Sequence, residues 1–349
     1  MSNMKDLRPL AITQGDPAGI GPEIIAKAFR DAPEALRGAF VVGEVATLRR
    51  AAGCIARSGQ PALPVAVLSS AAQAISTPAR CMPVLPLPGL PGPLPYGKVD
   101  ARAGQSAATC VLWAARAALD GDVCALVTAP LHKEALHAAG VEFPGHTELL
   151  QYESAAHAGV ALEQMPVRMM LASDELCTVL VSIHLSLRAA IDAVTLHNVL
   201  ETLRITHETL TRSLGRAPRI GVAGLNPHAG EAGMFGREEI ELIAPAIAQA
   251  RAVGIDASGP WAPDTVFMRA RSTPARPGEF DAVVAMYHDQ GLIPVKYLGV
   301  DKGVNVTLGL PLVRTSPDHG TAFDIAGTGQ ADAASLIEAV RWARRMSQS

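Results

Sequence analysis

The 349-residue sequence has few aromatic residues, at 4%, and few charged residues, at 18%, whereas 49% of it is hydrophobic. Its 30 Lys and Arg nearly balance its 33 Asp and Glu, so no overall basic field favours nucleic acid or an anionic membrane surface. No run approaches the roughly 20 uninterrupted apolar residues of a membrane span. A chain of this length and apolar content buries a large core, which excludes disordered and collagen-like proteins and predicts two domains.

Cysteine is scarce and shows no pairing pattern. The five cysteines contain no CxxC pair and lie in apolar surroundings, at Cys54, Cys81, Cys110, Cys124 and Cys177. This predicts reduced packing residues rather than a disulfide framework or a zinc cluster. The first residues, MSNMKDLRPLAITQGD, lack the basic and apolar segments of a secretory signal, so we expect a cytoplasmic protein.

Short apolar runs alternate with segments of helical spacing, a pattern typical of α/β proteins with largely parallel sheets flanked by helices. We expect strands at 10–13, 40–42, 65–68, 124–128, 167–171, 178–183, 220–223, 282–286 and 304–308, and helices at 22–30, 103–119 and 238–252. Pro245 should bend the last helix or start it afresh. The proline-rich segment 81–97 is expected to form a surface crossover rather than a central strand, with a proline-motif ligand as the alternative.

Three of the ten histidines share a local pattern, because each follows closely on an apolar strand. They end the segments TVLVSIH, IGVAGLNPH and DAVVAMYH, at His184, His228 and His288. Ligands of open α/β sheets bind beyond the carboxyl ends of strands, and three imidazoles without cysteine suit a catalytic divalent metal. We therefore expect one metal site, and the alternative is that each histidine caps its own strand end.

Polar groups follow other predicted strands in the same way. ITQGDPAGIGPE places glycines between a strand and a helix, where backbone N–H groups can meet an anion, although a structural turn is the alternative. LVTAPLHK ends at Lys133, which in a crevice would balance an anion or take part in proton transfer. FPGHTE places His146 and Thr147 on a turn that opens a helix.

The segment from Tyr287 to Gly327 is the densest in chemical groups. Lys296 and Arg314 are candidate anion clamps, because arginine offers a bidentate fork and lysine a compact charge. Asn305 lies in an otherwise apolar strand and needs a partner if it is buried, and a substrate would be such a partner. The polar loop at 315–321, taken alone, predicts a capped helix start.

Seven motifs together resemble one family: ITQGDPAGIGPE, TAPLHK, GHTE, GLNPHAGE, GPWAPDTVF, AMYHDQGLIPVK and VNVTLGLPLVRTSPDHGTAFDIAG. In this order, over residues 12–340, they are similar to the 4-hydroxythreonine-4-phosphate dehydrogenases, the decarboxylating enzymes of pyridoxal phosphate synthesis. The resemblance implies a two-domain fold like that of isocitrate and isopropylmalate dehydrogenases, with the active site in the inter-domain cleft. It also implies NAD rather than NADP, zinc ahead of magnesium, manganese or cobalt, and a homodimer whose active site is completed across the interface.

The family's functional positions map onto this sequence residue by residue. The resemblance implies metal ligands at His184, His228 and His288, and substrate contacts at His146, Thr147, Lys296, Asn305 and Arg314. HGTAFDIAG resembles the adenosine loop of isopropylmalate and isocitrate dehydrogenases, which implies cofactor contacts at His319, Gly320, Thr321, Asp324 and Gly327. Three residues remain candidates for the general base, namely Lys133, His146 and Asp264.

The expected reaction is NAD-dependent oxidation of 4-phosphooxy-L-threonine and loss of CO2, giving 3-amino-2-oxopropyl phosphate, with help from a divalent metal. Departures from the family pattern, GPWAPDT for GPLPADT and SIHLSL for THLPL, leave other substrates open. These are D-threonate or D-erythronate 4-phosphate and an aromatic cis-dihydrodiol of the terephthalate type, although the intact GHTE argues against the last. From another class, the histidines would serve a metal-dependent hydrolase, an aldolase or a non-catalytic metal-binding protein.

The fold cousins imply one domain that is built from both ends of the chain. Residues 1–140 with 300–349 are expected to form the α/β cofactor-binding domain. Residues 141–299 are expected to form the α/β domain that holds the metal and makes the dimer. Lys133, Lys296 and Arg314, beside a metal dication, would make a local cationic pocket for a small anionic substrate on an otherwise slightly acidic protein.

Overall fold

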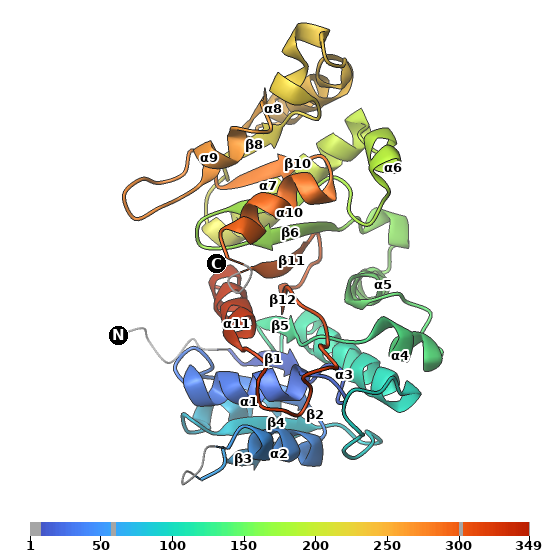
Figure 1. Ribbon diagram of the computed structural model, residues 1–349, viewed down its shortest axis with the longest axis vertical. Helices are drawn as coiled ribbons and strands as arrows, with labels where there is room; N and C mark the ends of the chain where they lie inside the picture. Colours follow the sequence, from blue (N-terminus) through green and yellow to red (C-terminus); the bar gives the residue numbers. More distant parts are fainter. Residues whose placement is uncertain (1–7, 57–60, 300–302, 349) are drawn as a thin grey trace. The chain divides into compact units, whose positions relative to one another are not determined.

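The computed structural model describes residues 8–56, 61–299 and 303–348, and its contacts divide the chain into two compact units (Figure 1). The first unit is built from Met1–Pro166 and Leu310–Ser347, and the second from Val167–Gly309. Each unit is an α/β structure with a largely parallel sheet and flanking helices, as the alternating sequence pattern predicted. Residues 1–7, the first part of the segment MSNMKDLRPLAITQGD that predicts no secretory signal, lie outside the described residues.

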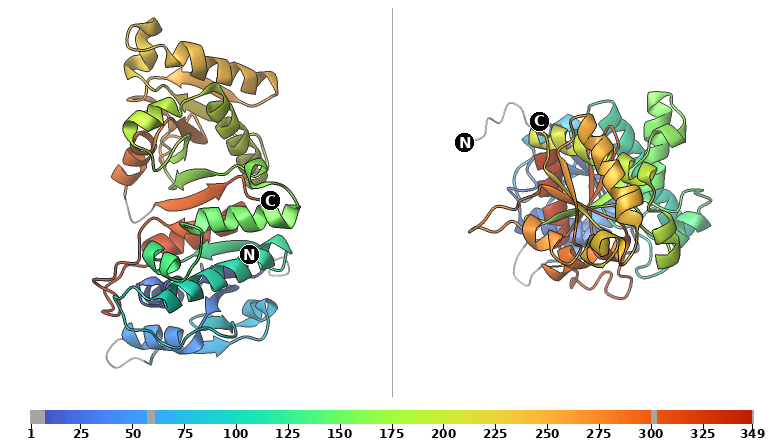
Figure 2. Two further views of the ribbon diagram at one scale, coloured as in Figure 1. Left: turned by 90° about the vertical axis from the view of Figure 1, so that its right-hand side faces the viewer. Right: turned by 90° about the horizontal axis from the view of Figure 1, so that it is seen from above.

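The unit boundaries differ from those expected from the sequence. Residues 141–166 lie in the first unit, because α5 (His146–Ala158) packs against α3 (Ala101–Leu119). β11 (Val304–Leu308) lies in the second unit, because it pairs with β6 (Arg168–Ala172). The first unit still combines both ends of the chain: α11 (Ala334–Met346), drawn in red, packs on β12, on β5 and on the blue α1 (Figures 1 and 2).

The sheet of the first unit has the strand order β3-β4-β2-β1-β5-β12, and its neighbours pair in parallel. The strands are β1 (Leu10–Thr13), β2 (Ala39–Gly43), β3 (Val65–Val67), β4 (Met82–Pro86), β5 (Ala125–Thr128) and β12 (Arg314–Pro317). Helices α1 (Gly21–Asp31), α2 (Val45–Cys54) and α4 (Lys133–Ala138) follow β1, β2 and β5. β1, β2 and β5 are buried along their whole length, because helices cover both faces of a parallel sheet.

The expectation for the proline-rich segment was wrong at its start. β4 (Met82–Pro86) lies inside the sheet, between β3 and β2, and four of its five residues are buried. The backbone pairing tolerates the prolines, because pairing with β2 begins at Val84, one residue after Pro83. On the side of β3, Met82 N donates to the carbonyl of Pro64 and the carbonyl of Val84 accepts from Leu68 N. The hydrogen bonds to this side therefore come from the residues before and after Pro83, whose missing N–H is not needed.

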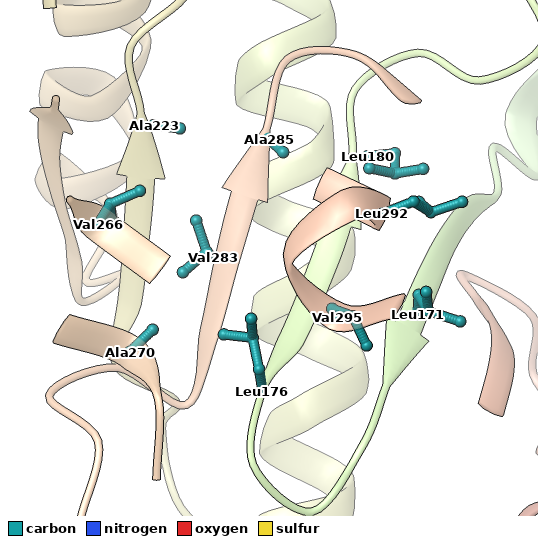
Figure 3. Close-up of a cluster of buried hydrophobic side chains, with 10 residues drawn as sticks. All are labelled: Leu171, Leu176, Leu180, Ala223, Val266, Ala270, Val283, Ala285, Leu292 and Val295. Carbon is teal, nitrogen blue, oxygen red and sulfur yellow. The ribbon is translucent and has the colours of Figure 1, made fainter. Parts of the chain in front are cut away.

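The sheet of the second unit has the strand order β11-β6-β7-β10-β8-β9. β6 is antiparallel to both its neighbours, whereas β7 (Cys177–Leu180), β10 (Ala282–Ala285), β8 (Ile220–Ala223) and β9 (Ala257–Trp261) run parallel. α9 (Val266–Ala270) and α10 (His288–Tyr297) pack on one face, and α7 (Leu196–Leu214) lies behind the sheet (Figure 3). Their apolar contacts form one core of Leu171, Leu176, Leu180, Ala223, Val266, Ala270, Val283, Ala285, Leu292 and Val295.

The remaining helical segments follow the sequence with small shifts. The helix expected at 238–252 is divided into a π-helical turn at Glu239–Ile243 and α8 (Ala244–Ala252), because Pro245 starts a new helix in its first turn. α6 (Leu187–Asp192) is a short addition after β7, and short 3₁₀ segments lie at Ala71–Ser76 and Leu162–Gln164. No helix in the described residues is long and apolar enough to cross a membrane.

Candidate functional site

Arg314 is a buried cation in the first unit, with a side chain only 6% exposed. It opens β12, and its Nε and Nη2 donate hydrogen bonds of 3.1 and 2.7 Å to Oγ1 of Thr128, the last residue of the neighbouring β5. Burial lowers the pKa of Arg314 to about 10, and the carboxylate of Glu148 acts in the opposite direction. The guanidinium therefore stays charged at neutral pH, and an anion beside it would offset its desolvation.

His146 and Thr147 are the first two residues of α5, so the GHTE motif opens a helix as predicted. Helix N-termini attract anions through their free backbone N–H groups. Burial, together with the positive charge of Arg314, holds the pKa of His146 well below its usual value, so the ring is neutral at neutral pH. Its buried Nε2 has no hydrogen-bond partner within the described part of the chain. A buried ring nitrogen of this kind is placed to meet a ligand.

The structure thus brings together His146, Thr147 and Arg314 among the substrate residues expected from the sequence. Lys296 and Asn305 belong to the second unit instead. Lys296 lies in the last turn of α10, and Asn305 is the second residue of β11. Both side chains are half-buried.

The three histidines expected to bind a metal follow three adjacent parallel strands of the second unit. His184 comes after β7, His288 after β10 and His228 after β8, and β10 pairs with both of the other strands. The rings of His184 and His288 lie 5.9 Å apart between centroids. Two imidazoles that share one zinc ion place their centroids at most about 6.5 Å apart, because each Zn–N bond is about 2 Å. The separation of these two rings lies within that upper limit.

The surroundings of two of these rings also suit metal binding. Nδ1 of His228 lies 3.1 Å from a carboxylate oxygen of Glu231, and Nδ1 of His288 lies 2.7 Å from Asp289 Oδ1. Metal-binding histidines commonly donate one ring N–H to a carboxylate and present the other nitrogen to the ion. Across residues 8–56, 61–299 and 303–348, however, no three His, Cys, Asp or Glu side chains are close enough to hold a metal as they stand.

Asp264, a candidate general base, lies near one of these histidines. It lines a hollow of the second unit together with His228, Tyr287, Asp289 and Gln290. Phe267, Ile293 and Tyr297 give this hollow an apolar side. Lys133, the other candidate base outside α5, is exposed at the start of α4 in the first unit.

Two further groups near Lys133, His132 and Asp16, lie in motifs of the sequence but were given no functional role there. The ring of His132 stacks on Phe323 at 4.7 Å between centroids, and its buried Nδ1 has no hydrogen-bond partner in the described ranges. Asp16 is 1% exposed, and burial raises its pKa although the nearby His132 acts to lower it. Both residues lie in motifs that the sequence singled out, but nothing in their spacing indicates that one faces the other.

The expected cofactor loop, residues 319–327, lies between β12 and α11 in the first unit. The sequence predicted a helix directly after residues 315–321, but Thr315 and Ser316 belong to β12 and α11 begins only at Ala334. Thr321 is buried and its carbonyl accepts a hydrogen bond from Ile20 N at 3.0 Å. His319, Gly320 and Asp324 are exposed.

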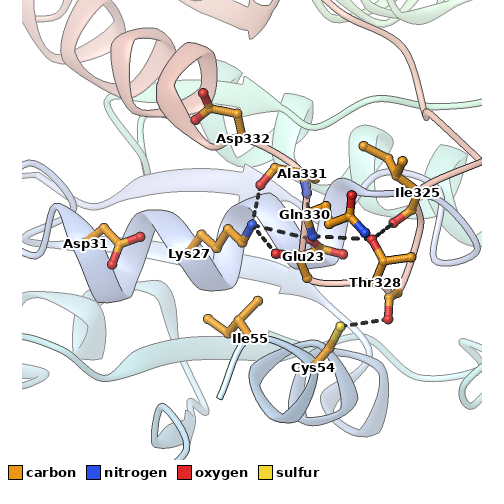
Figure 4. A network of polar contacts seen from close by, with 12 residues as sticks. Glu23, Lys27, Asp31, Cys54, Ile55, Ile325, Thr328, Gln330, Ala331 and Asp332 are labelled. Carbon is orange, nitrogen blue, oxygen red and sulfur yellow. Dashed lines mark hydrogen bonds and ion pairs between the residues drawn. The ribbon is translucent and has the colours of Figure 1, made fainter. Parts of the chain in front are cut away.

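The end of this loop is fastened to α1 and α2 (Figure 4). Cys54 Sγ donates to the carbonyl of Gly327 at 2.9 Å. Lys27 Nζ donates to the carbonyls of Gly329, at 2.8 Å, and Ala331, while Glu23 Oε1 accepts from Ala331 N at 2.9 Å. A network of this kind holds residues 327–331 in one conformation, which fixes one end of the loop.

Comparison with known proteins agrees with the motif order. The family described as Pyridoxal phosphate biosynthetic protein PdxA matches residues 35–343. The chain belongs to this family. A 4-hydroxythreonine-4-phosphate dehydrogenase of Beijerinckia indica is 50% identical over 339 residues, covering 97% of this chain and 95% of that protein. A D-threonate 4-phosphate dehydrogenase of Salmonella typhimurium is 44% identical, covering 98% of this chain and all of that protein.

The same family appears among solved structures. The crystal structure of a 4-hydroxythreonine-4-phosphate dehydrogenase from Klebsiella pneumoniae has a TM-score of 0.86 and 43% identity, covering 98% of each chain. The expected family and fold class are thereby confirmed. The chain is accordingly an oxidoreductase of the dehydrogenase type, and the hydrolase, aldolase and non-catalytic alternatives find no support.

Proposed function

We propose that this enzyme oxidises 4-phosphooxy-L-threonine with NAD and releases CO2, giving 3-amino-2-oxopropyl phosphate and NADH. In the net reaction, the hydroxyl carbon transfers a hydride to NAD and the hydroxyl releases a proton. The resulting β-keto acid then loses its carboxyl group as CO2, and the carbanion equivalent takes up a proton. Two relatives that match nearly the whole chain support a phosphorylated hydroxy acid as the substrate class.

The observation that carries this proposal is the proximity of His146 to Arg314, whose charge acts on the His146 ring. A buried guanidinium would supply charge for the phosphate or carboxylate of the substrate, and the neutral ring of His146 offers a buried nitrogen that has no hydrogen-bond partner among the described residues. Thr147, beside His146 at the helix N-terminus, would add a hydroxyl donor. Lys296 and Asn305 would complete the substrate contacts from the second unit.

The histidines of the second unit would hold the divalent metal. His184, His228 and His288 are neutral nitrogen donors of the kind that zinc accepts, with magnesium, manganese and cobalt as other candidates. A bound dication would act as a Lewis acid, lowering the pKa of the substrate hydroxyl and stabilising negative charge on its oxygen. Asp289 and Glu231 would keep the Nδ1 atoms of His288 and His228 protonated.

The proton of the hydroxyl requires a base, and three candidates remain. His146 is neutral at neutral pH and is therefore able to accept a proton. Asp264 lines the same hollow as His228, whereas Lys133 is exposed in the first unit. The loop at residues 319–327 would contact the cofactor, which we propose to be NAD rather than NADP. The contacting residues would be His319, Gly320, Thr321, Asp324 and Gly327.

The proposal extends to assembly and compartment. We propose a homodimer whose active site is completed across the interface. Sedimentation would test the dimer, and recovery of activity on mixing two variants that are each inactive alone would test the shared active site.

We also propose that the protein is cytoplasmic. All five cysteines lie in the described ranges and are free thiols, which suits the reducing cytoplasm. Fractionation of cells that produce the protein would test this location.

One assay separates the substrate candidates. The purified enzyme, supplied with NAD and zinc, is offered 4-phosphooxy-L-threonine, D-threonate 4-phosphate, D-erythronate 4-phosphate and an aromatic cis-dihydrodiol, and NADH formation and CO2 release are followed. We expect the highest kcat/KM for 4-phosphooxy-L-threonine. A higher value for D-threonate 4-phosphate, the substrate named for the Salmonella relative, would make that compound the substrate. No NADH with any phosphorylated acid would contradict the proposal.

A further inference from the structure

Arg50, in α2 of the first unit, contacts two separate segments of the chain. Its Nη1 donates a hydrogen bond to the carbonyl of Leu94 at 2.5 Å, and its Nη2 donates to the carbonyl of Pro17 at 3.1 Å. The guanidinium also lies over the ring of Tyr96, with its Cζ 3.9 Å from the ring centroid. Arginine suits these three contacts, because its planar group donates in its own plane while its face stacks on an aromatic ring.

The segment that Arg50 holds is the end of the proline-rich region at 81–97. Leu94 is 4% exposed and is flanked by Pro93 and Pro95. Prolines fix φ and lack an N–H, so this stretch of backbone is stiff and offers acceptors but few donors. A guanidinium matches such a stretch, because it supplies several donors and no acceptor.

The expected cofactor loop, residues 319–327, contacts this segment at two places. At Gly327, the ring of Tyr96 lies so close that a Cβ on the glycine would be 2.3 Å from Cδ2 of the ring. At Phe323, the carbonyl oxygen would be 2.9 Å from a Cβ placed on Gly97. The end of the proline-rich segment thus supports both the middle and the end of the loop.

A second residue of α2 holds the same glycine of the loop. Cys54 follows Arg50 by four residues, so the two side chains lie on one face of the helix. Cys54 Sγ donates to the carbonyl of Gly327 at 2.9 Å (Figure 4). Gly327 is therefore connected to α2 directly through Cys54, and indirectly through the ring of Tyr96 and Arg50.

We propose that Arg50 is a positioning residue that keeps the end of the proline-rich segment where it holds the loop at 319–327 in its NAD-binding conformation. This inference rests on the proposed cofactor role of that loop. Arg50 contacts neither NAD nor substrate in this role; its effect passes through Tyr96 and Gly97 to the loop. Without these contacts the loop would populate other conformations, and the apparent affinity for NAD falls with the fraction of molecules in the binding-competent one.

The test measures NAD binding by the full-length protein with isothermal titration calorimetry. Arg50→Met removes the charge and both hydrogen bonds, whereas Arg50→Lys keeps the charge but loses the planar fork. Arg49→Met is the matched control, because Arg49 is the exposed neighbour on the same helix. We expect the Kd for NAD to rise about tenfold in Arg50→Met, to rise less in Arg50→Lys, and to stay unchanged in the control.

Three further measurements separate positioning from a general structural defect. Hydrogen exchange of residues 319–329, followed by mass spectrometry without NAD, should be faster in Arg50→Met than in wild type. Arg50→Met should add little to the Kd in a Tyr96→Leu background, because both changes break the same connection. At saturating NAD, kcat of Arg50→Met should stay within about twofold of wild type, whereas a general defect would lower it.

Each outcome bears on one step of the inference. Equal NAD affinity in wild type and Arg50→Met would overturn the positioning role alone. A raised Kd with unchanged exchange of the loop, or fully additive effects of Arg50→Met and Tyr96→Leu, would also overturn it. Absence of NAD binding by the wild type would overturn the proposed cofactor and this inference with it. If Arg50→Met does not fold, unchanged NAD affinity in Tyr96→Leu overturns the inference.

Discussion

Arg314 and Thr128 form a paired clamp in which one threonine hydroxyl accepts two hydrogen bonds from one guanidinium, at 3.1 and 2.7 Å. The two residues come from neighbouring parallel strands and are 186 positions apart in the sequence. The hydroxyl fixes the plane of the guanidinium, which decides where its remaining N–H groups point. An anion bound beside this guanidinium, as we propose for the substrate, would be recognised by direction as well as by charge.

Replacement of Arg314 by lysine tests this recognition. Lysine keeps the charge but loses the planar fork, so we expect kcat/KM for the phosphorylated substrate to fall about 10- to 100-fold. Arg341→Lys is a matched control, because Arg341 is exposed on α11 and pairs with Glu338. Thr128→Val should give a smaller loss of the same kind. Unchanged kcat/KM in Arg314→Lys would remove Arg314 from the substrate site.

The lowered pKa of His146 predicts a pH dependence of stability. Its pKa in the folded protein lies well below the value of 6.5 expected when unfolded, so below that value the unfolded chain binds the proton more readily. Stability is therefore complete above about pH 6.5 and declines as the pH falls further. Denaturant unfolding from about pH 7 to pH 5 should show a smaller decline in His146→Gln than in wild type. His197→Gln, at an exposed position, should follow wild type.

Gly327 lies in the expected cofactor loop, where both its backbone conformation and the space around it disfavour any other residue. Its φ is +78°, and a Cβ would lie 2.3 Å from the ring of Tyr96. Gly327→Ala should displace the loop and raise KM for NAD about tenfold or more, with a smaller effect on kcat. Gly89→Ala is the control, because Gly89 has nearly the same φ, +77°, with open space around it. Equal KM values for NAD in the two variants would separate Gly327 from cofactor binding.

Cys110 should be inert in the folded protein. Burial in α3 raises the pKa of its thiol to about 12, and the thiolate is the form that reacts with thiol reagents. Mass spectrometry after brief labelling should find Cys110 unmodified in the native protein and modified in denaturant. The half-buried Cys81 provides an internal comparison in the same sample. Rapid native labelling of Cys110 would contradict its burial.

Local sequence patterns predicted correctly those strands and helices whose own residues favour the structure that they form. β1 and β11 have the expected bounds, and α5 begins at His146 as GHTE indicated. The sequence did not predict the proline-rich strand β4. Proline lacks a backbone N–H, but this disfavours a strand only where a neighbouring strand would accept a hydrogen bond from that N–H, and the sequence does not show which strands are neighbours. The register with β2 begins after Pro83, and a register is a property of two strands.

The sequence by itself determined the family, the alternation of strands and helices, and the residue types able to bind an anion or a metal. Those are properties of short segments and of their order along the chain. Only the tertiary structure decided that His146 lies within electrostatic reach of the buried Arg314 and that two hydrogen bonds of Gln290 join Gly224 to Met286. The burial of a side chain, and therefore its pKa, depends on segments that are far apart in the sequence. The hydrogen-bond partners of the backbone groups at a strand end depend on such segments as well.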